Sequence, residues 1–165
     1  MKRIVIFILS VFLAGTAFAA GSGGGGGGGG GATGASSSSS SRPSPSSALD
    51  FYNVGYAASQ AGNYTEAIND FQKAISLKSD YAEAYNMLGF STRKTGDVAK
   101  AFTYYETALR LKPNFPEARE YYGEAYLQQG NLAKAVQQYI ILQKAGNKNA
   151  TELLEKIGDF VNQKS

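Results

Sequence analysis

The chain has 165 residues, with 16 Lys and Arg, 13 Asp and Glu, 20 Gly, and neither Cys nor His. Without thiols or imidazoles it can form no disulfide, zinc finger or imidazole base, so any metal would need oxygen ligands and any catalysis would depend on carboxylates, hydroxyls or amines. No motif for a metal or a cofactor is present, and we expect neither. From residue 48 onward 13 basic and 13 acidic residues balance, which argues against nucleic acid or an anionic membrane surface as the partner.

The first segment has the features of a secretory signal peptide. Lys2 and Arg3 precede an apolar run over residues 4–15, and small residues follow at Ala17 and Ala19. The run is shorter than the ~20 apolar residues that span a bilayer, which favours cleavage after Ala19 over an uncleaved anchor. We therefore predict a signal peptide over residues 1–19, membrane contact only during export, and an exported protein of the bacterial periplasm.

Residues 20–47 form a second block of low complexity. Glycine fills positions 23–31 and serine fills positions 36–41, and prolines follow at Pro43 and Pro45. No large apolar side chain is present to offset the entropy of ordering this segment, so we predict a disordered linker with a reach of ~30 Å. A tether and an unselected repeat expansion are equally compatible with this composition.

From residue 48 the sequence repeats itself with a spacing of 34 residues. Four classes of position recur in three copies, which are Gly55, Gly89 and Gly123, then Gly62, Gly96 and Gly130, then Ala67, Ala101 and Ala135, and then the rings Phe71, Tyr105 and Tyr139. Self-similarity at a fixed period indicates a solenoid, with repeats over 48–81, 82–115 and 116–149. The amphipathic stretch after them predicts a capping helix over 150–165, with Leu153, Leu154, Ile157, Phe160 and Val161 on one side.

Each copy has apolar residues at helical spacing on either side of a Gly-Asn or Gly-Asp pair, which predicts a hairpin of two helices. Gly89 and Ala101 allow the two backbones to approach while Tyr105 fills the space beside them. Four pairs have the spacing of capping boxes at predicted helix starts, namely Asn63 with Glu66, Asp80 with Glu83, Asn114 with Glu117, and Asn149 with Glu152.

These positions resemble the tetratricopeptide repeat (TPR) family. The resemblance is carried by Tyr85, Leu88, Gly89, Ala101, Tyr105, Ala108 and Pro113. The sequence departs from the family pattern at Arg119, which replaces a ring, at Ser79 and Asn147, which replace the closing Pro, and at Leu142, which replaces an Ala. The resemblance implies an all-α solenoid whose first helices line a concave face that grips a peptide or helix of a partner protein, without enzymatic activity.

The family's groove positions map onto eight residues of this chain. They are Tyr52 and Tyr56 in the first repeat, Asn86, Phe90 and Arg93 in the second, and Glu120, Glu124 and Leu127 in the third. One end of this peptide-binding groove is therefore expected to be aromatic and the other acidic. Members of the family that bind chaperone tails hold a carboxylate with Lys and Asn, where this chain has Tyr52 and Tyr56, so that activity is not expected.

Other interpretations of the same residues stay open. Tyr52, Tyr56 and Phe90 could pack between repeats, and Arg93 could form a partly exposed ion pair with Glu120 or Glu124. The chain could serve as a structural subunit of a cell-envelope assembly or secretion complex, or as a homodimer, rather than as an adaptor for a partner in the cell envelope.

A distant third interpretation makes the chain an enzyme. Glu120 and Glu124 lie one helical turn apart and could act on a glycosidic bond as an acid and a nucleophile. Paired carboxylates at this spacing are common on solvated helix faces, and the sequence supplies no substrate cleft beside them. The sequence therefore favours protein recognition over glycan hydrolysis.

Overall fold

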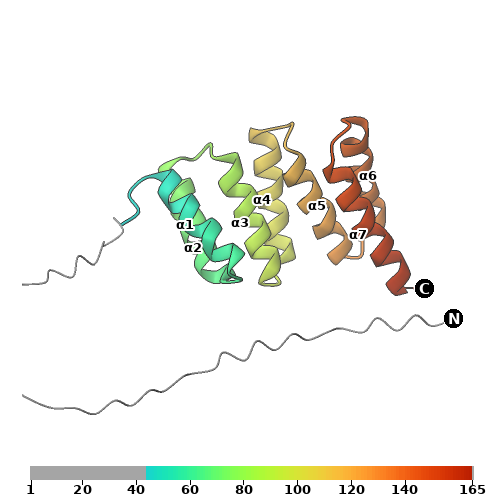
Figure 1. Cartoon of the computed structure of the whole chain (residues 1–165), viewed down its shortest axis with the longest axis horizontal. Coiled ribbons are helices and arrows are strands. Elements are labelled where there is room, and N and C mark those ends of the chain that lie inside the picture. Colours follow the sequence, from blue (N-terminus) through green and yellow to red (C-terminus); the bar gives the residue numbers. More distant parts are fainter. Residues whose placement is uncertain (1–43, 165) are drawn as a thin grey trace, which may run out of the picture. The chain divides into compact units, whose positions relative to one another are not determined.

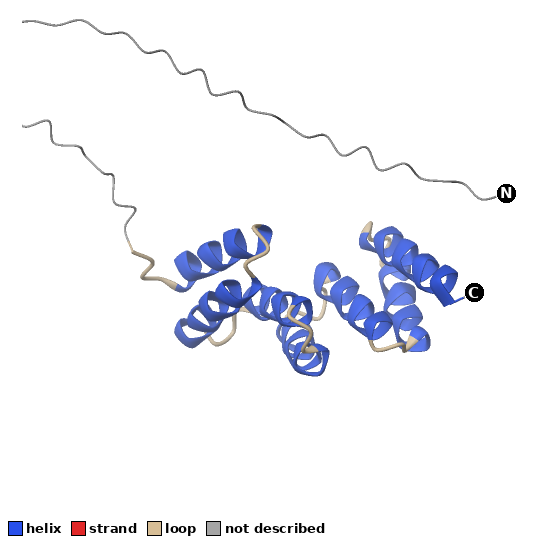
Figure 2. Cartoon of the chain, turned by 90° about the horizontal axis from the view of Figure 1, so that it is seen from below, coloured by secondary structure: helices blue, strands red, loops and turns tan. Residues whose placement is uncertain are grey.

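The computed structural model describes residues 44–164, which fold into seven α-helices (Figure 1). Figure 2 shows helices and loops but no strand in this part of the chain, so the predicted all-α fold is confirmed. The predicted signal peptide and the linker up to residue 43 lie outside the described residues. The helices are α1 Ala48–Gln60, α2 Tyr64–Leu77, α3 Ala82–Lys94, α4 Val98–Leu111, α5 Pro116–Gln128, α6 Leu132–Lys144 and α7 Asn149–Lys164.

The helices stack as hairpins in chain order (Figure 1). Helix α1 packs on α2, α3 on α4 and α5 on α6, and each second helix also contacts the first helix of the next hairpin. The first helices contact one another, α1 with α3 and α3 with α5, and α7 continues this row by contacting α5. Between residues 44 and 164, the second helices α2, α4 and α6 make no such contact with one another. Helices α1, α3, α5 and α7 therefore form the inner face of the stack.

The recurring glycines and rings explain why the hairpins are tight. A Cβ built on Gly89 would lie 2.8 Å from the Tyr105 ring, and one on Gly55 would lie 3.0 Å from the Phe71 ring. Both rings are fully buried. A larger residue at either glycine would force the two helices of its hairpin apart. The inter-helix glycines serve a different purpose, since Gly96 has φ of +98° in the turn between α3 and α4, where other residues are strained.

None of the four predicted capping boxes forms, and three of them concern the starts of α2, α3 and α5. Asn63 is the N-cap residue of α2, but its side chain accepts no capping hydrogen bond. The N-caps of α3 and α5 are Tyr81 and Phe115, each one residue after the predicted Asp80 or Asn114. The Phe115 ring is buried, so we infer that packing of an apolar side chain, and not a capping hydrogen bond, fixes this helix start.

Side-chain caps do form at three other helix starts. Ser47 and Asp50 form a complete capping box before α1, with the Asp50 backbone N–H donating to Ser47 Oγ at 3.1 Å. Asp97 accepts from the backbone N–H of the third residue of α4 at 3.0 Å, and Asn131 does the same for α6 at 3.1 Å. These bonds satisfy N–H groups that otherwise have no partner in the first helical turn.

The last helix differs from its predicted form at two points. It begins at Asn149 rather than after it, and the Asn147 side chain accepts from the Asn149 backbone N–H at 3.0 Å. Its predicted apolar side is only partly buried, because Leu153 is fully covered while Leu154 is 47% exposed. No helix in the described range, including the 16-residue α7, is long and apolar enough to cross a membrane.

Candidate functional site

The aromatic half of the inner face begins on α1. The Tyr52 and Tyr56 rings stack with their centroids 6.2 Å apart, and Tyr52 also lies 5.1 Å from the Tyr81 ring and 5.7 Å from the Phe71 ring. Burial, followed by the charges of Tyr81 and Glu83, raises the pKa of Tyr52 to about 12. Tyr56 is 43% exposed, so part of this ring surface is open to a ligand.

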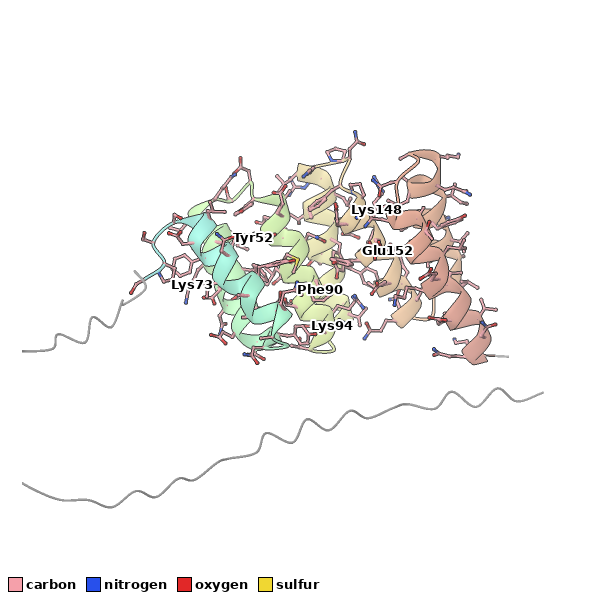
Figure 3. The ribbon with its side chains drawn as sticks, in the orientation of Figure 1. Tyr52, Lys73, Phe90, Lys94, Lys148 and Glu152 are labelled. Atoms are coloured by element: carbon pink, nitrogen blue, oxygen red, sulfur yellow. The ribbon has the colours of Figure 1, made fainter. Side chains whose placement is uncertain are left out.

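The aromatic surface continues through α3 to α5. The Phe90 centroid lies 5.1 Å from that of Tyr121 and 6.0 Å from that of Tyr64, so the ring fills the space between neighbouring repeats. Lys94 Nζ lies 5.4 Å from the Phe90 centroid, and Figure 3 shows these two side chains close together. The family's groove positions do not include Tyr121. The sequence feature that could have pointed to Tyr121 is its ring, because the equivalent position of the second repeat holds Met87, which has no ring.

Arg93 joins the second repeat to the third through an ion pair. Its Nη2 donates to Glu124 Oε2 at 2.6 Å, and its Nε lies 3.5 Å from the Tyr105 hydroxyl, to which it donates. Of the two acidic partners predicted for Arg93, the structure pairs it with Glu124 and not with Glu120. The pair is partly exposed at its Glu124 end, where the side chain is 18% exposed, and buried at its Arg93 end, where the side chain is 8% exposed. Burial acts to lower the pKa of Arg93, and the charges of Tyr105 and Glu124 outweigh it and raise that pKa.

Glu120 lies at a different junction, between α5 and α7. It is 5% exposed and accepts a hydrogen bond from Asn149 Nδ2, and Asn149 is itself buried. Burial raises the pKa of the Glu120 carboxyl to about 7, the bond from Asn149 opposes the shift, and Glu152 and Glu124 add to it. Glu120 therefore holds α7 against α5 rather than facing solvent.

The remaining predicted groove residues are covered. Asn86 is 3% exposed and its Oδ1 has no hydrogen-bond partner, and Leu127 is 7% exposed. Of the eight predicted residues, the structure therefore leaves substantial ring surface at Tyr52, Tyr56 and Phe90, and it covers most of the polar ones.

An open hollow of about 490 Å³ lies on the inner face beside the acidic end. Residues of α3 and α5 line one side of it, and residues of α7 line the other, among them Arg93, Glu124, Leu127, Lys156, Asp159 and Phe160. The repeat pattern predicts only a capping function for α7, so its contribution to this hollow was missed. The amphipathic pattern of α7 does not indicate which of its polar residues face a neighbouring helix.

Charge is divided between the two faces of the stack. The inner helices α1, α3, α5 and α7 carry eight acidic and five basic residues, whereas α2, α4 and α6 carry three acidic and five basic residues. The excess of acid on the inner side comes from α5 and α7, which together carry six acidic and three basic residues. The inner face is therefore aromatic toward α1 and acidic toward α7, as Figure 3 illustrates for Tyr52, Phe90 and Glu152.

The acidic side chains of α5 include the two that were considered for catalysis, Glu120 and Glu124. Within residues 44–164, no group of three or more acidic side chains is placed to hold a metal ion. The two carboxylates considered for glycan hydrolysis both have structural partners, Arg93 for Glu124 and Asn149 for Glu120. Glu124 lines the hollow on the inner face, but Glu120 does not, so the two are not placed together at one cleft as a paired acid and nucleophile would be.

Comparison with known protein families agrees with the hairpin architecture. A model described as TPR repeat matches residues 55–96, and a second described as tetratricopeptide repeat matches residues 91–150. The chain belongs to the tetratricopeptide repeat family. A search of curated protein sequences gives no match to this TPR protein.

Solved structures share the TPR fold. One is the Yersinia enterocolitica type III secretion chaperone SycD in complex with a peptide of the translocator YopD, with 21% identity and a TM-score of 0.62 over 71% of this chain and 94% of SycD. Another is the first TPR of Spaghetti (RPAP3) bound to the HSP90 peptide SRMEEVD, with 22% identity and a TM-score of 0.61 over 70% of this chain and 93% of that one.

A third structure, MamA, is more similar in sequence, with 33% identity and a TM-score of 0.54. The match covers 68% of this chain and 61% of the MamA chain, so this TPR protein spans about three fifths of MamA. Together the comparisons establish the family and the fold, and two of the similar structures contain a bound peptide.

Proposed function

We propose that this TPR protein is an adaptor that binds a peptide or helix of a partner protein along its inner face. The observation that carries this proposal is the row of part-exposed rings, Tyr52, Tyr56 and Phe90, on first helices that lie side by side. Rings bury a large area at a low cost in side-chain entropy and often anchor protein interfaces.

Peptide binding by two structures with the same fold supports this proposal. The groove chemistry of this chain nevertheless differs from that of a carboxylate clamp, because Tyr52 and Tyr56 occupy the clamp positions. A C-terminal carboxylate is therefore not the expected ligand. The acidic excess on α5 and α7 favours a partner segment that combines apolar or aromatic residues with at least one Lys or Arg.

Selection of a displayed random-peptide library on the full chain tests the proposal even while the natural partner is unidentified. Selected sequences are expected to combine a ring or a large aliphatic residue with a basic residue. In a titration with one such peptide, Tyr56→Ala is expected to weaken binding at least about tenfold, since buried aromatic anchors are typically worth ~2 kcal/mol or more.

Ile141→Ala is the matched control for Tyr56→Ala. Ile141 lies on α6, away from the inner face, and it is 42% exposed, which is close to the 43% of Tyr56. Affinity within about twofold of the parent is expected, because surface truncations away from an interface have small effects. Loss of binding in Ile141→Ala together with an unchanged affinity in Tyr56→Ala would contradict the proposal.

An alternative function is that of a structural subunit in a larger envelope assembly. The observation that favours it is the pair of large apolar side chains exposed on α6, Ile140 and Ile141. Exposed apolar residues that gather on one surface often mark a protein contact. Ile141→Ala also tests this alternative when binding to the intact assembly is measured in place of binding to a peptide. Weaker binding of this variant to the assembly would favour the alternative.

We also propose that the protein is exported to the bacterial periplasm. Support comes from the sequence alone, namely the basic start, the apolar run over residues 4–15 and the small residues around Ala19. Mass spectrometry of protein from the producing cells is expected to give an N-terminus within about two residues of Ala20. Retention of Lys2 in the mature protein would contradict cleavage.

A further inference from the structure

The contacts that hold helix α7 on α5 include one close apolar contact and one buried polar contact. A Cβ built on Gly123 would lie 2.6 Å from Leu153 Cδ2, which shows how closely the two helices approach. Beside this contact the Glu120 carboxylate accepts a hydrogen bond from Asn149 Nδ2, and both residues are buried. Docking of α7 therefore takes the Glu120 carboxyl group out of water.

The charged groups around Glu120 do not neutralise it. Glu152 on α7 and Glu124 on α5 both act on it as negative charges. Arg93 on α3 is the nearby buried cation, and Glu124 already binds it at 2.6 Å. Lys148 lies in the loop that leads into α7, where Figure 3 shows it near Glu152, and it is exposed to solvent.

We propose that docking of α7 onto α5 depends on pH, so that protonation of Glu120 holds the helix in place and ionisation of Glu120 weakens its attachment. A buried carboxylic acid bonded to an amide and facing a second carboxyl group is a stable arrangement. When Glu120 and Glu152 are both ionised, their charges repel each other, and the buried Glu120 carboxylate is not hydrated. Undocking of α7 relieves both costs.

The raised pKa of Glu120 determines whether docking of α7 becomes stronger or weaker as pH rises. Burial raises the pKa of this carboxyl from 4.5 to about 7, with Glu152 and Glu124 adding to the shift. A carboxyl with a raised pKa in the docked state binds its proton more tightly when α7 is docked. Docking is therefore most stable below about pH 4.5, loses stability as pH rises toward 7, and changes little above that.

The consequence for binding rests on the proposed function, whereas the docking equilibrium does not. Lys156, Asp159 and Phe160 of α7 line the hollow on the inner face together with Glu124 and Leu127. When α7 leaves α5, the hollow loses one side. A partner that occupies the hollow is therefore expected to bind more tightly at acidic pH.

Amide hydrogen exchange of the full chain at pH 5 to 8 tests the proposal and requires no partner. After correction for the intrinsic exchange rate, the opening equilibrium of residues 149–164 is expected to increase at least about tenfold between pH 5 and pH 8 in the parent. Residues 64–77 of α2 serve as an internal reference that should not change. Glu120→Gln, which mimics the protonated acid, is expected to remove the dependence, while Glu155→Gln, an exposed acid on α7, should retain it.

Two results would overturn the proposal. One is an opening equilibrium of α7 that is the same at pH 5 and pH 8 in the parent protein, and the other is an unchanged pH dependence in Glu120→Gln. If Glu120→Gln does not fold, Glu152→Gln replaces it. That variant removes the opposing carboxylate and must reduce the change between pH 5 and pH 8, so an unaltered change again contradicts the proposal. Because the experiment contains no ligand, these results are independent of whether the inner face binds peptides.

Discussion

The second and third repeats have the same 34-residue register but complete their cores in different ways. In the second repeat, Gly89 faces Tyr105 of its own hairpin partner, and that ring is fully buried. In the third repeat, Gly123 faces Leu153 of α7 instead, and the corresponding ring, Tyr139, is only partly buried. The glycine of the second repeat is thus packed by a ring of its own hairpin, whereas the glycine of the third repeat is packed by the helix that follows that repeat.

This difference places the response to pH that we propose at the C-terminal end of the inner face. Packing between α1 and α2 or α3 and α4 involves rings of the same hairpin, so local opening of one hairpin costs the burial of a whole side chain. Attachment of α7 involves Leu153, Ile157 and the Glu120 carboxyl, whose pKa is raised to about 7 by burial. The aromatic half of the inner face lies on the hairpins α1–α2 and α3–α4, and the acidic half lies beside the attachment of α7.

The largest expected effect comes from truncating the two equivalent rings. Tyr105→Ala removes a fully buried ring and is expected to lower the free energy of unfolding by ~3 to 5 kcal/mol. Tyr139→Ala, at the same repeat position, removes a partly buried ring and is expected to cost about half as much or less. Urea unfolding of both full-length variants measures this difference, and equal losses would show that the two repeats are packed alike.

Shortening single side chains of α7 should have a smaller effect on stability and should show which side of this helix is docked. Leu153→Ala leaves a cavity in front of Gly123 and is expected to cost ~2 to 4 kcal/mol. Its neighbour Leu154, which is 47% exposed, is the matched control, and Leu154→Ala should change stability by ~0.5 kcal/mol or less. Thermal unfolding monitored by circular dichroism checks both, and a larger loss in Leu154→Ala would mean that α7 docks through its other side.

The smallest effect is expected from adding one methyl group at the two equivalent glycines. Gly89→Ala pushes on the rigid Tyr105 ring, so we expect a net loss of ~1 to 2 kcal/mol after the gain in helix propensity. Gly123→Ala pushes on the flexible end of Leu153, so global stability should change little while exchange of residues 149–164 becomes faster. Faster exchange throughout the chain in Gly123→Ala would contradict local control of α7.

The sequence predicts the hairpins well because their determinants repeat. Small residues at Gly55, Gly89 and Gly123 and rings on the second helix of each hairpin recur at one spacing, and the six helices α1 to α6 follow from them. The helix starts are less predictable. At Tyr81 and Phe115 a ring is the N-cap residue, so the polar residue just before it does not accept the capping hydrogen bond that its spacing suggests.

The candidate site was predictable only at positions that the family's groove pattern covers. The rings of α1 and α3 follow from the family's groove positions, and so does the pairing of Arg93 with Glu124. The contact between Glu120 and Asn149 does not, because it joins the last repeat to a helix that lies outside the 34-residue pattern. Contacts made once in a chain leave no periodic signal in its sequence.

The central claim, that the inner face binds the partner, is tested most directly by nuclear magnetic resonance. A peptide selected on the full chain is added to isotope-labelled protein, and the changes in amide chemical shift are mapped onto the helices. We expect the largest changes on α1, α3 and α5 around Tyr56, Phe90 and Tyr121, with further changes on α7 if the peptide reaches the hollow. Changes concentrated on α2, α4 and α6, with the inner helices unaffected, would contradict the account.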